Sequence, residues 1–192
     1  MPKPFRLLIT VPGSFETGGV GRQVQYLTSA VAAAHPEATV TLLDTRGNGR
    51  AALSPFYLLK ALGRTAAYAR ERRRAVVHVN LASYASTARK FTLVAWAKAW
   101  GFPVLLHLHG AEYRKFYGKL PGPLKAAVRW MFSRAQAVVV LGPLWRQFVV
   151  ETLGVPESRV TVIPNAVPAP QLRPAARRGV PLILFLGRLG ER

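Results

Sequence analysis

Short apolar stretches alternate with longer amphipathic stretches along most of the chain, and this alternation constrains the fold more than any other feature of the sequence. The short stretches are typical of strands, whereas the longer ones repeat apolar residues at the spacing of a helix. Strands that alternate with helices predict βα units and a parallel sheet. Several strands are apolar throughout, so helices are expected on both faces. We therefore predict an α/β fold with a Rossmann-like, doubly wound parallel sheet. The predicted strands are 5–11, 39–43, 75–79, 103–108, 136–141 and 160–163, and the predicted helices are 20–33, 54–73, 83–100, 123–134 and 143–153.

The sequence predicts one such domain followed by the start of a second. At 192 residues with 50% hydrophobic content, the chain can bury a full core. The alternating pattern covers residues 1–164. Residues 165–180 are rich in Pro, Ala and Arg and resemble an interdomain linker. Residues 181–192 open with another apolar stretch, which either pairs with the first sheet or is the first strand of a truncated second domain. We favour the second interpretation.

The strong positive charge predicts an anionic partner. The formal net charge is +19 at pH 7, from 27 Lys and Arg residues and 8 acidic residues. Nucleic acid, an acidic membrane and a phosphorylated substrate all fit this sign. We find no recognised nucleic-acid-binding motif, so nucleic acid is not an expected partner. The sequence contains no cysteine and only 4 histidines, so disulfides are excluded and no bound metal is expected.

The sequence offers no obvious means of crossing a membrane. No apolar run approaches the about 18 residues that span a bilayer. The N-terminal stretch resembles a signal peptide superficially, but its apolar core is short and leads into a glycine-rich loop. We interpret it as the first strand and expect the chain to lie inside the cell.

A histidine and a carboxylate follow the predicted strand 103–108 directly, as His109 and Glu112. Ligands of open parallel sheets bind just outside the carboxyl ends of the strands. His109 is therefore a candidate site residue by position. The alternative is that its side chain only packs at the end of the core. His107 lies within the strand, and we interpret it as a core residue.

A glycine-rich loop precedes the first predicted helix. Gly18, Gly19 and Gly21 lie where free backbone amides and the helix dipole favour phosphate. The loop matches a dinucleotide fingerprint only in part, because Val24 stands where a small residue is expected. Asp44 lies about where a ribose-binding acid would be. The alternatives are an NAD-type dinucleotide-binding domain and a plain turn into a helix.

Several predicted helices interleave aromatic residues with Lys and Arg, a combination that suits the surface of an anionic membrane. The alternative is that the aromatic residues belong to the core and that the charges are solvated. A non-catalytic membrane-binding module is thus a second hypothesis for the chain. The predicted membrane-surface residues are Arg72, Arg73, Arg74, Lys90, Trp96, Lys115, Lys119, Lys125 and Arg129.

Five motifs occur in the order that is typical of family 4 glycosyltransferases. They are a GG loop after the first strand, HLHGAEY, AQAVVVLGPLW, VIPNAV and LFLGRLGER. The chain resembles this family over nearly its whole length. The resemblance implies the GT-B architecture of two facing Rossmann-like domains, of which this chain would be the N-terminal, acceptor-side half. The resemblance is to members of the family that assemble bacterial exopolysaccharide, lipopolysaccharide and phospho-glycolipids, and it implies a role of this kind.

The resemblance also implies a reaction and its donor-side residues. A sugar would move from a nucleotide-sugar donor to an acceptor hydroxyl, with retention at the anomeric carbon and without a metal or other cofactor. Gly18 and Gly19 match the glycines that lie against the donor's diphosphate or sugar. His109 matches the histidine that contacts the transferred sugar near the reacting centre, and Arg188 matches an arginine that holds the diphosphate. Arg, Lys and helix amides would stabilise the charge on the leaving diphosphate.

On the acceptor side, the resemblance implies a lipid-linked or polysaccharide acceptor at the inner face of the cell membrane. Glu112 and Asn165 are the acceptor-side candidates, and Asn165 matches the asparagine at the domain crossover. The family's lysine after Arg188 and its paired glutamates have no counterpart in the sequence. We therefore expect the chain to be a fragment, a truncated reading frame or one subunit of a split transferase, inactive without a partner that supplies the donor domain.

Overall fold

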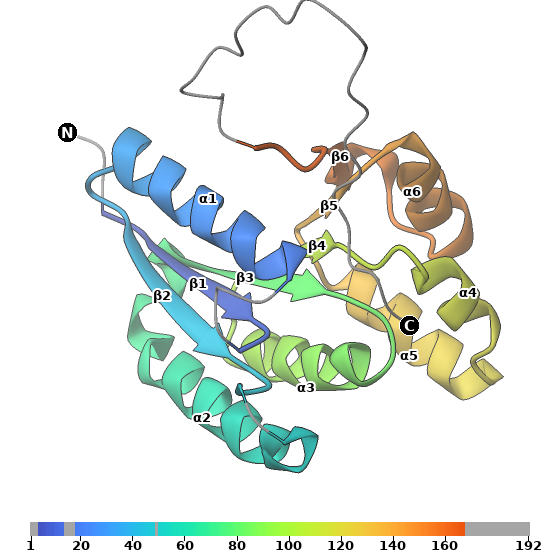
Figure 1. Ribbon diagram of the computed structural model, residues 1–192, viewed down its shortest axis with the longest axis horizontal. Helices are drawn as coiled ribbons and strands as arrows, with labels where there is room; N and C mark the ends of the chain where they lie inside the picture. Colours follow the sequence, from blue (N-terminus) through green and yellow to red (C-terminus); the bar gives the residue numbers. More distant parts are fainter. Residues whose placement is uncertain (1–3, 14–17, 49, 168–192) are drawn as a thin grey trace, which may run out of the picture.

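The computed structural model describes residues 4–13, 18–48 and 50–167, and it contains one six-stranded sheet in which all paired strands run parallel. The strand order is β2-β1-β3-β4-β5-β6 (Figure 1). The predicted α/β class and the Rossmann-like parallel sheet are thus confirmed. The strands are β1 Arg6–Val11, β2 Thr39–Asp44, β3 Ala75–Leu81, β4 Val104–Leu108, β5 Ala137–Val140 and β6 Val160–Val162.

The described helices follow the predicted ones closely, with differences at their ends. The predicted helix 54–73 ends early and continues as a 3₁₀ helix, η2, and the predicted helix 143–153 changes to a π-helical turn, η3. A short helix also precedes the predicted helix 123–134. The helices are α1 Gly19–Ala34, η1 Ala51–Leu53, α2 Ser54–Ala67, η2 Ala69–Arg74, α3 Ala85–Ala99, α4 Tyr113–Gly118, α5 Gly122–Ser133, α6 Pro143–Gln147, η3 Phe148–Thr152 and η4 Glu157–Arg159.

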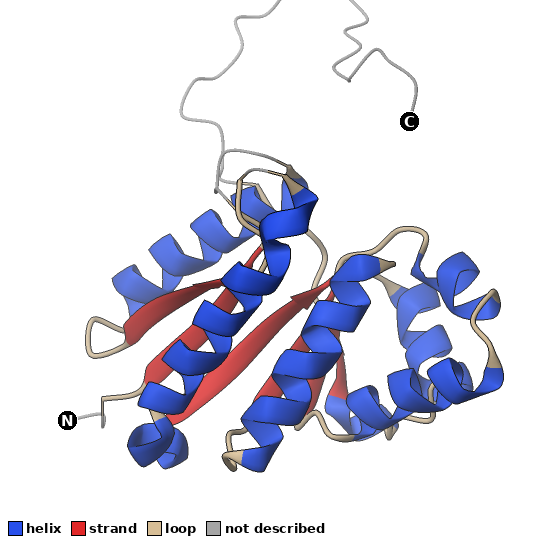
Figure 2. Cartoon of the chain, turned by 90° about the horizontal axis from the view of Figure 1, so that it is seen from below, coloured by secondary structure: helices blue, strands red, loops and turns tan. Residues whose placement is uncertain are grey.

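The order of connection makes the sheet doubly wound. The chain passes from β1 outward to β2 through α1, returns across β1 to β3 through α2, and then continues in the other direction. Figure 1 shows α1 on one face of the sheet and α2 and α3 on the other, and Figure 2 shows α2 and α3 lying over the strands. The direction reverses between β1 and β3, which is the place where open α/β sheets bind ligands.

The core lies mainly between the sheet and the helices α2, α3 and α5. β3 supplies a nearly continuous row of buried residues, as expected for a central parallel strand. Val77 and Leu106 are fully buried in this core, and Phe102 and Phe132 fill the space beneath the helices. A smaller cluster around Ile9, on the other face, packs against α1.

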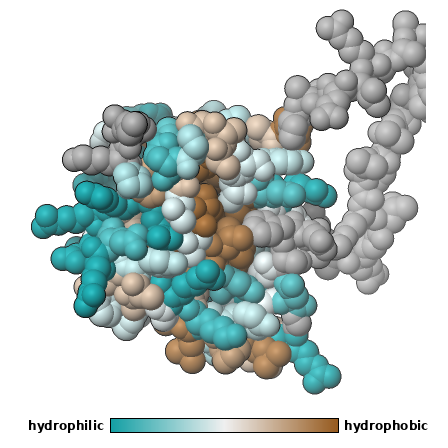
Figure 3. Space-filling view, turned by 90° about the vertical axis from the view of Figure 1, so that its left-hand side faces the viewer, coloured by the Kyte–Doolittle hydropathy of each residue, from teal (hydrophilic) through white to brown (hydrophobic). Residues whose placement is uncertain are grey.

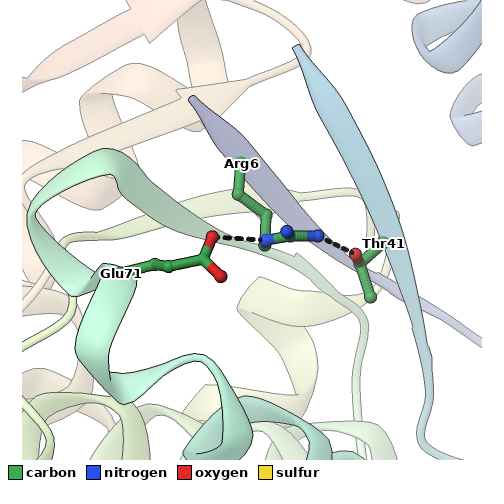
Figure 4. Close-up of polar contacts among 3 residues, drawn as sticks. All are labelled: Arg6, Thr41 and Glu71. Atoms are coloured by element: carbon green, nitrogen blue, oxygen red, sulfur yellow. Dashed lines mark hydrogen bonds and ion pairs between the residues drawn. The ribbon is translucent and has the colours of Figure 1, made fainter. Parts of the chain in front are cut away.

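An arginine at the start of β1 ties the edge of the sheet to η2. The Arg6 side chain donates from Nε to Glu71 Oε2 at 2.9 Å and from Nη1 to Thr41 Oγ1 at 3.2 Å (Figure 4). Its guanidinium group also lies over the Tyr68 ring, 4.0 Å from the ring centroid. Because the Glu71 side chain is half exposed, this ion pair stabilises the fold by about 1 kcal/mol at most. Apolar burial therefore dominates the stability of the domain.

Replacement of Leu106 by alanine should destabilise the domain strongly. Leu106 is fully buried at the centre of β4, so the variant loses apolar contacts and leaves a cavity. We expect the free energy of unfolding to fall by about 2–5 kcal/mol in urea denaturation. Leu144→Ala is the matched control, because Leu144 is 74% exposed and its loss should change the value by about 0.5 kcal/mol or less. Equal losses in the two variants would show that the core is assigned wrongly.

Candidate functional site

Three polar side chains join the carboxyl ends of β1, β3 and β4. Asn80, near the end of β3, donates from its backbone N to Thr10 Oγ1 and from Nδ2 to the Thr10 carbonyl, both at 2.8 Å. His109 follows the end of β4, and its backbone N donates to the Leu81 carbonyl at 2.9 Å. The His109 Nε2 atom lies 2.9 Å from Asn80 Oδ1. His109 is therefore fixed to β3, one of the two strands between which the direction of the chain reverses.

These hydrogen bonds determine which nitrogen of His109 carries the proton. The Asn80 amide nitrogen must face the Thr10 carbonyl, because a carbonyl oxygen only accepts. Asn80 Oδ1 then faces His109, so His109 Nε2 must donate. Burial first, and then the neighbouring His107 and His78, lower the pKa of His109 to about 3. His109 is thus neutral near pH 7, with Nδ1 unprotonated and able to accept a hydrogen bond.

Two further histidines stack beside His109. The ring centroids of His107 and His109 are 3.9 Å apart, and those of His78 and His107 are 5.5 Å apart. The Nε2 atoms of His78 and His107 are buried and have no hydrogen-bond partner among the described residues. Burial lowers the pKa of His107 to about 4, and burial together with His107 lowers the pKa of His78 to about 3. The stack therefore presents neutral rings to its surroundings.

The histidine stack lines a pocket of about 460 Å³ on the α1 face of the sheet. Its walls come from α1, from β1, β3, β4 and β5, and from the segment 163–166 after β6. Gln23 on α1 holds this segment through a 2.9 Å hydrogen bond from Nε2 to the Ala166 carbonyl. The structure thus brings the predicted residues His109 and Asn165 into one pocket, together with Asn80. Apolar walls with a few convergent polar groups are typical of small-molecule sites.

The predicted residues Gly18, Gly19 and Glu112 do not line this pocket. Gly18 and Gly19 are exposed at the start of α1, whose next turns line the pocket. Glu112 is exposed at the start of α4, and its backbone carbonyl accepts from Phe116 N. Arg188 lies outside the described residues, as do the predicted start of a second domain, 181–192, and most of the predicted linker 165–180.

Asp44 has a structural role that argues against the dinucleotide-binding interpretation. Its Oδ1 atom accepts hydrogen bonds from the backbone N of Arg46 and Gly47 at 2.8 Å and of Gly13 at 3.1 Å. Gly13 has φ of 88°, and a Cβ there would lie 2.5 Å from Asn48 Oδ1. Asp44 therefore fastens the start of the glycine-rich loop to the loop after β2, and its Oδ1 atom is already occupied by three backbone donors.

The assignment of Lys90 to a membrane surface was wrong. The Lys90 side chain is 3% exposed, and its Nζ donates to Thr45 Oγ1 beneath the loop after β2. Burial, followed by the charge of Arg89, lowers the pKa of Lys90 to about 7, and Asp44 opposes this shift. Lys90 lies on the buried face of α3 together with Thr87 and Val94, and its basic character alone did not reveal this.

The remaining predicted membrane residues do not form one surface. Arg72, Arg73 and Arg74 are exposed on η2, directly before β3, and so lie at the edge where the strands begin. Lys115 and Lys119 lie on or after α4, and α4 follows β4 at the opposite edge. Lys125 and Arg129 continue along α5, and Trp96 lies in the second half of α3, where its Nε1 donates to the Leu62 carbonyl at 3.0 Å.

Neither a metal centre nor a membrane span is found in the part of the chain that the structure describes. No group of three or more acidic, histidine or cysteine side chains there is arranged to hold a metal ion. None of the described helices combines the length and the hydropathy that a transmembrane helix requires.

Asn80 and Thr10 were not among the site residues predicted from the sequence. Both are buried polar residues close to the end of a mainly apolar strand. That position was a usable signal, because a buried amide needs hydrogen-bond partners and the adjacent strand ends are the nearest source. The pairing itself depends on which strands are neighbours, and periodicity does not give the strand order.

Most of the chain matches the model of a known protein family. The model of a family described as Glycosyltransferase Family 4 matches residues 17–170. The matched region includes α1, all the strands after β1, and the residues His109 and Asn165. A search of curated proteins finds no match to the chain.

Acid should destabilise the domain through the histidine stack. The folded chain holds His78 and His109 neutral with pKa values of about 3, whereas an unfolded histidine has a pKa of about 6.5. The unfolded state therefore binds more protons below pH 6.5, so the free energy of unfolding falls as the pH drops from 6.5 toward 4 and is at its full value above 6.5. Each neutral buried histidine adds about 1.4 kcal/mol per pH unit to this slope. Urea denaturation at several pH values measures it.

His78→Gln should reduce the pH dependence of the free energy of unfolding by the contribution of one histidine. The control is His35→Gln, because His35 is exposed at the end of α1 and lies outside the stack. If the slope is the same for His78→Gln and the wild type, the stack does not hold His78 neutral.

Proposed function

The chain belongs to glycosyltransferase family 4, and on that premise we propose that it transfers a sugar, with retention, to a lipid-linked or polysaccharide acceptor at a membrane. Membership of the family makes it a glycosyltransferase domain that acts between a nucleotide-sugar donor and an acceptor. The observation that carries the finer proposal is the Asn80–His109 pair in the pocket at the carboxyl ends of β3 and β4.

His109 would contact the sugar that is transferred. Because Nε2 donates to Asn80, the unprotonated Nδ1 is the atom that can accept a hydrogen bond from a sugar hydroxyl. Asn80, itself held by Thr10 through two hydrogen bonds, fixes the ring so that this contact has one geometry. Fixed positioning of reacting groups supplies a large part of many enzymatic rate enhancements.

The donor's diphosphate would lie near the start of α1. Gly18 and Gly19 precede the first turn of this helix, where free amides and the helix dipole stabilise negative charge. Arg188, outside the described residues, would add a guanidinium group to the leaving diphosphate. Within the proposal, a second Rossmann-like domain or a partner chain binds the nucleotide, and transfer depends on it. The reaction as proposed needs no metal.

Exposed apolar side chains support contact with a membrane at the carboxyl edge of the sheet. The helices α2, α3 and α5 all start at this edge, and exposed apolar side chains lie just before them or in their first two turns. Figure 3 shows apolar surface at the lower end of the molecule, where α2 lies. We call these residues the carboxyl-edge patch: Leu53, Phe56, Leu59, Tyr84 and Leu124.

Basic residues accompany the patch, which would suit the anionic inner face of a cell membrane. Lys60 lies over the Phe56 ring, 4.4 Å from its centroid, and Lys119 and Lys125 flank the turn between α4 and α5. The same patch favours a second candidate function, a membrane-binding module without catalytic activity. Sugar transfer and vesicle binding separate the two candidates.

Replacement of His109 by alanine should slow sugar transfer. The assay mixes the chain with a separately produced donor-binding domain of the family and follows a radiolabelled sugar from a panel of nucleotide sugars into a lipid fraction. Loss of the positioned ring should lower kcat/KM by about 10²-fold. His35→Ala, at an exposed histidine, is the control and should match the wild type. An unchanged rate in His109→Ala removes His109 from the site, and the absence of transfer with every donor and acceptor contradicts the transferase proposal.

Binding to anionic vesicles should depend on the lysines near the carboxyl-edge patch. We compare the triple variant Lys115→Gln/Lys119→Gln/Lys125→Gln with Arg72→Gln/Arg73→Gln/Arg74→Gln, which loses the same charge at the opposite edge. Each basic residue near the surface contributes about 1 kcal/mol, so the lysine variant should bind about 10²-fold more weakly and the arginine variant should change little. Sedimentation with phosphatidylserine vesicles measures this. Equal losses would indicate attraction by net charge alone, without a defined membrane face.

A further inference from the structure

We propose that a groove between α3 and the α4–α5 pair holds the hydrocarbon chain of an anionic acceptor lipid. This inference rests on the proposed function, because it adds a binding site for the apolar part of the acceptor. It concerns the face of the sheet opposite the histidine pocket, and it uses residues that the sugar-transfer site does not.

The groove has a volume of about 450 Å³ and largely apolar walls. Small residues such as Ala85, Ala88 and Ala127 leave the space open, and the rings of Phe91 and Phe116 close its sides. The rim carries Tyr84 and Leu124, which are 57% and 52% exposed. Pockets of this size hold molecules of ordinary ligand dimensions. We call this space the α3–α5 groove.

The α3–α5 groove begins beside the sugar-transfer site. A Cβ added at Gly110 would lie 3.1 Å from Ser83 Oγ and 3.3 Å from Ser83 N, so the residue after His109 packs against the residue before Tyr84. Tyr84 then stands at the mouth of the groove. A lipid with its hydroxyl near His109 therefore has a short path past Tyr84 for its chain.

Tyr84 has an unusual backbone conformation that holds its ring at this mouth. It is the one residue other than glycine with positive φ in the described part of the chain, at φ 58° and ψ −130°. Its ring packs against Phe116, with the centroids 5.1 Å apart. Strained backbone of this kind concentrates at ligand clamps and active sites, because the surrounding structure must maintain it. A tyrosine ring also suits the boundary between an apolar chain and a polar headgroup.

Charge complementarity points to an anionic lipid as the occupant. Lys115, Lys119 and Lys125 lie on the elements that form one wall, and none of them takes part in an ion pair with a described residue. A phosphate headgroup near these lysines would gain charge-assisted hydrogen bonds while its chain entered the groove. A partner helix is a poor fit, because a helix with its side chains is about 10 Å across and would need a longer trough.

The test measures binding of dodecyl phosphate by calorimetry below its micellar concentration, with no sugar donor present. Ala88→Phe should fill the α3–α5 groove and weaken binding by at least about tenfold, because the chain loses its apolar contacts. Ala126→Phe is the matched control, because Ala126 is exposed on α5 and does not line the groove, and it should bind as the wild type does. Butyl phosphate, which has the same headgroup, should bind far more weakly than dodecyl phosphate.

In the binding experiment, either of two results would overturn the inference: Ala88→Phe binds dodecyl phosphate as the wild type does, or butyl phosphate binds as tightly as dodecyl phosphate. Circular dichroism checks that Ala88→Phe is folded, and if it is not, Leu124→Gln at the exposed rim replaces it, with several-fold weaker binding expected. Failure of the sugar-transfer assay leaves this binding result standing. Normal transfer with an unchanged KM for a long-chain acceptor in Ala88→Phe overturns the groove and leaves the transferase function intact.

Discussion

The hydrogen bonds of Asn80 are the constraint on which the candidate site depends. One side chain and its backbone N join β3 to Thr10 on β1 and, through Oδ1, to His109 after β4. A buried amide group without a hydrogen-bond partner would cost about 1–3 kcal/mol of folding free energy. The hydrogen bonds of Asn80 therefore stabilise the arrangement of all three residues. The arrangement also selects the tautomer of His109. A structural requirement of the sheet and a chemical property of the site thus come from the same contacts.

The sequence contained enough information to predict the fold because the apolar pattern of the strands and the residues at the helix ends indicate the same elements. Buried strands such as β3 and β4 are apolar for nearly their whole length. The helices α2 and α5 each have a proline in the first turn, which favours the start of a helix. The ends of α2 and α6 were predicted less well. In both, the last turn tightens or widens into 3₁₀ or π geometry, and apolar spacing does not distinguish these from an α-helix.

The site was predictable in part. The position of His109 after an apolar strand was a sufficient signal, because strand ends in a parallel sheet share one edge. Its partner Asn80 required the strand order, and the burial of Lys90 required the direction of one side chain on α3. The predicted membrane residues lie at both edges of the sheet for a related reason. The two ends of a helix or strand lie at opposite edges, and composition does not show which end a residue is near. Local composition identified basic and aromatic helices, but the topology determined which of their ends lie beside the site.

A double-mutant cycle on Asn80 and His109, measured as kcat/KM for sugar transfer, tests most directly whether the two residues form one functional unit. If Asn80 acts by holding the His109 ring, Asn80→Ala and His109→Ala each lower the rate, and the double variant is no slower than His109→Ala alone. Losses that add in the double variant would contradict the account, because they would mean that the two side chains act independently and that their hydrogen bond does not organise the site.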